Sequence, residues 1–274
     1  MITYGAEAWF EPETSRQNKV VQAISKVQAS GMRVVAEAFR ATPVQELETE
    51  TFTSLLDIYC SELRARHLRR TYASPAGAFI KEQCRMISSR LRRRGPARVS
   101  PLIAPVIQEK LDWARDRERT LGTDSKKAIL HEWRGRWSRE KEQRKSCWCS
   151  RAAVEEPSAN RLKLHTQLKK AESAVLIQAR TGRIGLAHFL SKACVPGFES
   201  PACKCELGNE TAEHLLLHCR LETERRGWRR GATLSDLVSN PENTAATARW
   251  IIQSGRLDQF RLASRLLYSS ERVI

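Results

Sequence analysis

The sequence predicts a mainly α-helical protein made of two helical halves that a basic linker joins. Apolar residues recur at the spacing of one helical face in segment after segment, and strand-like alternation of apolar and polar residues is scarce. Residues typical of helix starts and ends flank several of these segments. The chain has 274 residues, 41% of them hydrophobic and 28% charged, which is enough for one large domain or two modest ones.

The first half covers residues 1–95. Between Ser15 and Arg40 the apolar side chains follow a helical period. Thr42 and Pro43 predict the start of a second helix, with the threonine hydroxyl as its cap and the proline in its first turn. A third, amphipathic helix is expected around residues 55–68, and its polar face collects the basic side chains Arg64, Arg66, Arg69 and Arg70.

A charged junction, residues 96–128, is expected to separate the two halves. It follows an arginine-rich stretch around Gly95 and Pro96 that includes Arg92, Arg93 and Arg94. Glycine and proline beside a run of like charges are typical of a linker. We therefore place the boundary between the helical halves here.

The second half covers residues 129–274. Trp133 and Trp137 lie four residues apart on one expected helix, and we expect them to pack in a core and not to stack on bases. Near the C-terminus, Thr233 and the Asn240-Pro241 pair each predict a helix start, and Gly255 predicts a helix end. The second half should thus contain several short helices.

The charge of the chain restricts its partners. Lysine and arginine number 47 against 31 acidic residues, a net charge of +16. Such a surplus favours a polyanionic partner, because each neutralised phosphate releases condensed counterions. Nucleic acid is the first candidate, and an anionic membrane surface is the second. No run of about 18 apolar residues is present, and residues 1–10 lack the features of a secretory signal. We expect an intracellular protein, nuclear or cytoplasmic, whose eight cysteines are thiols or metal ligands and not disulfides.

The strongest chemical signal lies at residues 203–219, where Cys203, Cys205, His214 and Cys219 have the spacing of a small zinc knuckle. Two thiolates on a tight turn can occupy adjacent corners of a tetrahedron, and Gly208 with the next residue can reverse the chain. A closed set of four protein ligands indicates one structural Zn²⁺ without an open position for substrate.

Some alternatives remain open for the other cysteines and histidines. His218 is an alternative ligand to Cys219 or His214, and otherwise a surface neighbour of the site. Cys147 and Cys149 repeat the one-residue spacing but lack a compact second pair of ligands, so no metal is expected there. The remaining cysteines are interpreted as ordinary buried or partly buried thiols, at Cys60, Cys84 and Cys194.

Several segments resemble the reverse transcriptases of non-LTR retrotransposons, especially fungal ones. Residues 4–9 (YGAEAW) and 38–43 (AFRATP) resemble the stretch that follows the polymerase core, and residues 180–186 (RTGRIGL) with the 203–219 cluster resemble the C-terminal part of these polyproteins. The resemblance covers most of the chain, and only the cysteine cluster is individually specific. It implies post-polymerase, thumb-like helices in residues 1–95 and a zinc knuckle near the end.

The departures from that family bear on activity. Reverse transcriptase needs adjacent aspartates to hold two metal ions, and none of the six aspartates here are neighbours. The polymerase core is expected to lie upstream of Met1, and residues 96–128 are too short for the ribonuclease H domain that related elements carry there. The Gly-rich phosphate loop, the nucleophile elbow and the His-Glu-x-x-His helix are also absent from the sequence. No catalytic activity of the chain on its own is expected.

The sequence therefore leads to a binding module whose arginines and lysines contact the backbone of RNA or DNA, with other parts of the retrotransposon machinery as further partners. Two alternatives remain: an enzyme fragment that acts only with an upstream polymerase domain, and an inert or protein-interaction remnant. The candidate phosphate contacts are Arg64, Arg66, Arg69, Arg70, Arg92, Arg93, Arg94, Arg180, Arg183 and Lys204.

Overall fold

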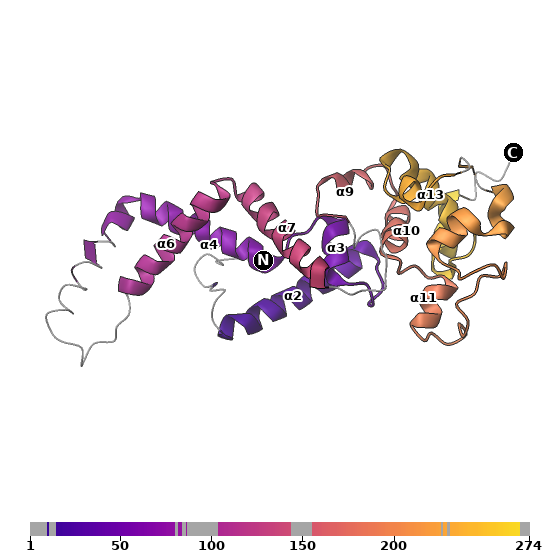
Figure 1. Ribbon diagram of the computed structural model, residues 1–274, viewed down its shortest axis with the longest axis horizontal. Helices are drawn as coiled ribbons and strands as arrows, with labels where there is room; N and C mark the ends of the chain where they lie inside the picture. The colour runs from indigo at the N-terminus through magenta and orange to yellow at the C-terminus, as the bar shows by residue number, and fades with distance from the viewer. Residues whose placement is uncertain are drawn as a thin grey trace. The chain divides into compact units, whose positions relative to one another are not determined.

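The computed structural model is mainly helical, which confirms the predicted fold class. It describes residues 10, 15–79, 82–83, 86, 104–143, 155–225, 227–228 and 231–268, and among these the only strand-like pairing is an isolated bridge between Ala202 and Asn209. The principal helices are shown in Figure 1: α2 (Ser15–Ala36), α3 (Val44–Thr51), α4 (Leu56–Ala73), α6 (Ala104–Leu121), α7 (Ser125–Gln143), α9 (Asn160–Lys163), α10 (Lys170–Thr181), α11 (Ala187–Lys192), α12 (Leu234–Val238), α13 (Pro241–Gln253) and α14 (Arg261–Tyr268). Short π- and 3-10-helical turns are η1 (His214–His218), η2 (Arg220–Arg225) and η3 (Asp258–Phe260).

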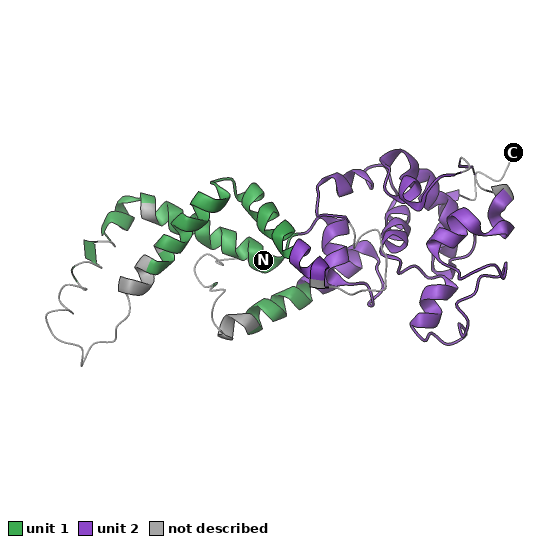
Figure 2. Ribbon diagram, viewed as in Figure 1, with its two compact units in different colours: residues 1–27, 54–136 green, residues 28–53, 137–274 purple. Residues whose placement is uncertain are grey.

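The chain divides into two compact units, coloured separately in Figure 2. Unit 1 comprises residues 1–27 and 54–136, and unit 2 comprises residues 28–53 and 137–274. The division differs from the expected boundary at residues 96–128. The described part of that junction belongs to unit 1, where α6 packs along α4, and residues 28–53 belong to unit 2, where Met32 and Leu47 pack against Ile177 of α10. Apolar burial between distant segments, and not the local run of charge, decides these borders.

Unit 1 contains a buried ion cluster around Glu62 of α4. The Glu62 carboxylate is 2% exposed and accepts hydrogen bonds from Arg69 Nη2 at 2.8 Å, Arg117 Nε at 3.2 Å and Ser125 Oγ at 2.8 Å. Arg117 also donates to Glu132 at 2.5 Å. The cluster ties α4, α6 and α7 together, because a buried carboxylate is stable only when it is paired and hydrogen-bonded.

The two tryptophans of α7 are buried, as the sequence predicts. Trp133 is 3% exposed and Trp137 is 9% exposed. Lys141, one turn after Trp137 on the same helix, places its ammonium 4.8 Å from the ring centroid. Core packing, and not base stacking, is therefore confirmed for this pair.

Unit 2 has one main apolar core, to which α10, α13 and the η1 turn contribute. Its central side chains are fully buried, among them Leu176, Leu215, Ile251 and Ile252. Trp228 and Trp250 pack edge to face beside it, with ring centroids 5.1 Å apart. This core is the base on which the cysteine cluster is built.

The helix starts and ends of unit 2 follow the sequence with one exception. Thr233 accepts a hydrogen bond from the Asp236 backbone N–H, Asn240 caps α13, and Gly255 ends that helix with a φ of 72°. Helix α3 begins as expected just after Pro43, but the predicted Thr42 cap is wrong. The extended Pro43 is the N-cap residue, and the buried Thr42 hydroxyl makes no hydrogen bond.

Candidate metal centre

A tight turn at residues 201–210 places the first two cysteines. The Cys203 N–H donates to the Gly208 carbonyl at 2.8 Å, and the Glu206 N–H donates to the Cys203 carbonyl at 2.8 Å. Glu206 adopts the left-handed backbone conformation with a φ of 64°, whereas the φ of Gly208 is not positive. A Cβ on Gly208 would lie 3.4 Å from His214 Nδ1, which is an ordinary van der Waals contact, so the turn packs closely against the histidine ring at this position. The turn leaves Cys203 2% exposed and Cys205 7% exposed.

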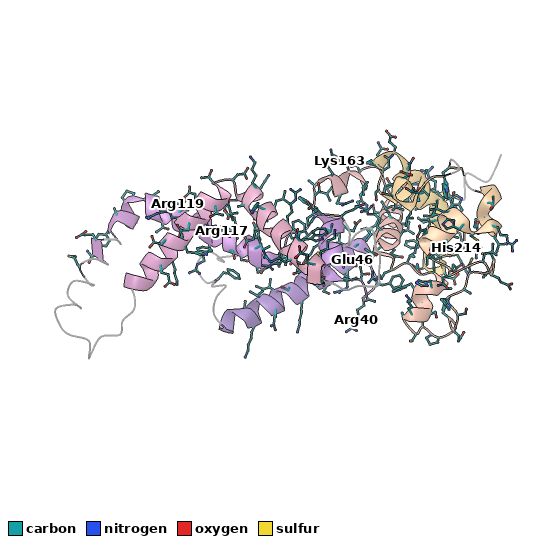
Figure 3. All side chains as sticks on the ribbon, in the orientation of Figure 1. Arg40, Glu46, Arg117, Arg119, Lys163 and His214 are labelled. Carbon is teal, nitrogen blue, oxygen red and sulfur yellow. The ribbon has the colours of Figure 1, made fainter. Side chains whose placement is uncertain are left out.

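The π-helical turn η1 places the other two residues. The Thr211 hydroxyl accepts the N–H of His214 at 3.1 Å and so caps the start of the turn, as its position in the sequence suggests. The Cys219 N–H then donates to the His214 carbonyl at 2.7 Å, an i→i+5 bond that stacks the two residues one wide turn apart. Leu215 and Leu216, both 0% exposed, anchor this turn in the core of unit 2. Burial of these leucines aims His214, labelled in Figure 3, toward the cysteines.

The four side chains converge on one point. A ligand atom from each of Cys203, Cys205, His214 and Cys219 lies within 4.8 Å of the others, and all four residues are buried. The Cys203 and Cys219 sulfurs are 3.7 Å apart, far longer than a disulfide of about 2.05 Å. Metal–sulfur bonds of about 2.3 Å in a tetrahedron require about 3.8 Å between sulfurs. The site can therefore hold a metal ion.

The distance between Cys205 and His214 differs slightly from that of a tetrahedral zinc site. Cys205 Sγ lies 3.1 Å from His214 Nε2, whereas a tetrahedral zinc site requires about 3.5 Å between such atoms. Burial raises the pKa of the Cys203 thiol to about 11, and a hydrogen bond from the Leu207 backbone lowers the pKa of Cys205. Metal binding must displace the proton of Cys203, since the thiolate is the ligand.

One arginine and two glutamates surround the site and pair with one another. Arg256, in the turn after α13, places Nη2 4.0 Å from the Cys219 sulfur. The same guanidinium pairs with Glu222 at 3.0 Å and with Glu210 at 3.2 Å. Glu210 in turn accepts the Ala187 N–H at 2.9 Å, which connects the start of α11 to the site. Sequence spacing gives no signal for Arg256, because it lies 37 residues from Cys219.

His218 is not one of the four residues that converge, and the other described cysteines differ in their burial. His218 is exposed at the end of η1, and the structure brings Cys219 to the site in its place. Cys60 is buried, as expected, but Cys194 is exposed, which corrects the prediction that this thiol is buried or partly buried. Cys84, Cys147 and Cys149 lie outside the described residues.

Two of the predicted phosphate contacts in unit 2 are buried, so that prediction is wrong for them. Arg180 is 0% exposed, and all five of its N–H donors are used: Glu50 takes two, Glu155 one, and Val238 O and Ser239 Oγ one each, at 2.6–2.9 Å. Arg183 is 7% exposed and pairs with Glu46 at 3.3 Å. Both arginines hold unit 2 together and are not available to a phosphate.

The arginines of α4 divide into two kinds. Arg64 is 7% exposed and donates to the Phe10 carbonyl, and Arg69 pairs with the buried Glu62, so both face the protein. Arg66 and Arg70 are exposed. Lys204, between the two cysteines of the turn, is exposed as well. Arg92, Arg93 and Arg94 lie outside the described residues.

Comparison of the chain with protein-family models, with curated proteins and with solved structures found no match. Among the described helices, none combines the length and the apolar character needed to cross a membrane.

Proposed function

We propose that this chain is a zinc-stabilised helical module that binds the backbone of RNA or DNA and has no catalytic activity of its own. The observation that carries the proposal is the convergence of four buried cysteine and histidine side chains within 4.8 Å of one another. Thiolates this close together in the interior are costly unless a bound cation offsets their charge.

Zinc is the metal that best fits this donor set. Three thiolates and one imidazole in a tetrahedral arrangement are typical of structural zinc, whereas magnesium and calcium prefer oxygen ligands. All four positions of the tetrahedron are filled by Cys203, Cys205, His214 and Cys219, so no position is left for a water or a substrate. The role of the metal is then to order residues 201–222 on the core of unit 2.

Nucleic acid is proposed as the partner because of the net charge of +16 and the distribution of free cations. Arg66 and Arg70 are exposed and lie four residues apart on α4, so their side chains share one face of that helix. Within the described part of the chain neither makes a hydrogen bond or an ion pair. Lys204 offers a third exposed cation, in the metal-binding turn itself.

The resemblance to non-LTR retrotransposon reverse transcriptases supports the same proposal. In that family basic helices after the polymerase precede a C-terminal knuckle, and this chain has two helices with a net positive charge, α4 and α7, before residues 203–219. We therefore extend the proposal to other components of the retrotransposon machinery as partners.

Metal content tests the first part of the proposal. Protein purified without added metal should contain about one equivalent of zinc by elemental analysis, and a Cys203→Ser plus Cys219→Ser variant should contain almost none. Cys194→Ser is the matched control, since this exposed cysteine lies in the same unit and should leave the zinc content unchanged. Less than about half an equivalent in the unaltered protein would contradict the proposal.

Salt dependence tests the second part. Fluorescence anisotropy with labelled single-stranded RNA should show a steep loss of affinity as salt rises, because each phosphate contact contributes a slope of about −0.7 on logarithmic axes. Arg66→Gln plus Arg70→Gln should reduce the slope by about 1.4 units if both contact phosphates. Binding that is absent or independent of salt contradicts nucleic-acid binding, and primer extension by the isolated chain contradicts the lack of catalysis.

A further inference from the structure

We infer that Arg256 is a positioning residue for the metal, which holds the ligand segment in its binding geometry and donates a hydrogen bond to the Cys219 thiolate. The inference rests on the proposed metal site and assigns an outer-shell partner to it. Outer-shell hydrogen bonds orient metal ligands, and their loss typically weakens metal binding by about 10- to 100-fold.

The backbone holds Arg256 firmly in place. It follows Gly255, whose φ of 72° turns the chain at the end of α13, and it precedes Leu257, which is 2% exposed. Ile252, on the preceding turn of α13, is 1% exposed in the core of unit 2. Buried residues on both sides of the turn therefore fix the direction of the arginine side chain, which is itself only 12% exposed.

The guanidinium bridges the two ends of the segment that carries two of the ligands. Glu210 lies just before the residue that caps η1, and Glu222 lies three residues after Cys219. Arg256 Nη1 donates to Glu210 at 3.2 Å, while Nε donates to Glu222 at 3.0 Å. Both carboxylates are largely buried, with exposed fractions of 8% and 3%. The arginine thus closes residues 210–222 into a loop with His214 and Cys219 inside it.

The same side chain reaches the metal ligands directly. Its Nη2 lies 4.0 Å from Cys219 Sγ, at the outer limit of an N–H···S contact. A metal-bound thiolate carries negative charge, so an N–H from a cation stabilises it. Lysine cannot replace this arrangement, since one ammonium cannot reach two carboxylates and a sulfur with the planar fork of a guanidinium.

The test compares metal retention by the full chain and two variants of Arg256. Competition with a chromogenic chelator should show about 10- to 100-fold weaker zinc binding for Arg256→Gln and a smaller loss for Arg256→Lys. Arg261→Gln is the matched control, because Arg261 is exposed and, among the residues described, pairs only with Asp258. Its zinc affinity should equal that of the unaltered protein.

Cobalt substitution separates a direct contact from a general loss of stability. The sulfur-to-cobalt charge-transfer band of the Co²⁺-loaded Arg256→Gln variant should shift, because the sulfur has lost its N–H partner, and the Arg261→Gln band should not shift. Zinc binding within about twofold of the unaltered protein, or an unshifted band, overturns the inference. If Arg256→Gln does not fold, the same two criteria apply to Arg256→Lys. The metal content of the unaltered protein is measured before any variant is compared. If that protein contains no metal, the proposed metal site itself is refuted.

Discussion

Replacement of Arg180 by methionine should destabilise the protein severely, although the residue lies far from the metal site in sequence. The side chain is 0% exposed and binds Glu50 through two N–H groups at 2.7 and 2.9 Å. It also binds Glu155 at 2.7 Å, and this contact lowers the pKa of the Glu155 carboxyl despite its burial. Methionine fills a similar volume but leaves Glu50 without the cation that pairs with it, whereas Glu155 keeps its ion pair with Arg161.

The expected magnitude follows from the burial of this ion cluster. Removing one partner of a buried ion pair costs about 3–5 kcal/mol, because an uncompensated charge remains in the interior. Arg180→Lys keeps the charge but supplies three donors in place of five, so it should cost less than methionine does. The assay is urea unfolding followed by circular dichroism and tryptophan fluorescence.

Arg261→Met is the matched control for this experiment. Arg261 is 76% exposed and its ion pair with Asp258 is a surface pair, so its loss should change the free energy of unfolding by less than about 1 kcal/mol. A loss of less than about 1 kcal/mol for Arg180→Met would show that the buried network does not form. Such a result would restore Arg180 as a candidate for contact with phosphate.

Three further predictions concern pH, metal removal and a buried hydroxyl. Burial lowers the pKa of His165, so below a pH of about 6.5 the folded state binds fewer protons than the unfolded state, and the free energy of unfolding should fall as pH falls. In urea unfolding between pH 8 and 5, His165→Leu should reduce the dependence of the midpoint on pH. His131→Leu, which replaces an exposed histidine, should leave that dependence unchanged. Removing metal with a chelator should lower the melting temperature of the unaltered protein in calorimetry and leave that of Cys203→Ser plus Cys219→Ser unchanged, because bound metal stabilises only the folded state. Tyr268→Phe should cost about 1.5–3 kcal/mol in urea unfolding, since the buried Tyr268 hydroxyl donates to Glu172 at 2.6 Å; a cost near zero would show that this bond contributes nothing.

The helices could be predicted from local patterns because the signals that define them are local. Apolar spacing marked α2 and α4, and the caps at Thr233 and Asn240 set the starts of α12 and α13. The predicted Thr42 cap is wrong because the helix begins one residue later than the sequence suggested. Pro43 takes the extended N-cap position itself, which leaves the threonine hydroxyl outside the helix.

The four residues that could hold a metal ion could also be predicted, since cysteine and histidine at short spacing need only one tight turn and one short helix to meet. The sequence did not predict that the turn η1 is π-helical, and this helix type decides which residues reach the site. The i→i+5 bond from Cys219 to His214 places these two ligands one π turn apart, which selects Cys219 over the adjacent His218. Arg256 was missed because its contacts with Glu210 and Glu222 form only when α13 packs on the core.

The sequence by itself determined the helical class, the basic charge and the four residues that meet at the candidate metal centre, because each depends on composition or on neighbours a few positions apart. Only the tertiary structure decided which arginines are free. Nothing in the sequence distinguishes Arg180 and Arg183 from Arg66 and Arg70. In the structure, Arg180 and Arg183 form ion pairs with buried carboxylates of α3, whereas Arg66 and Arg70 are exposed. A charge is available to a partner only when no segment brought close by folding has already neutralised it.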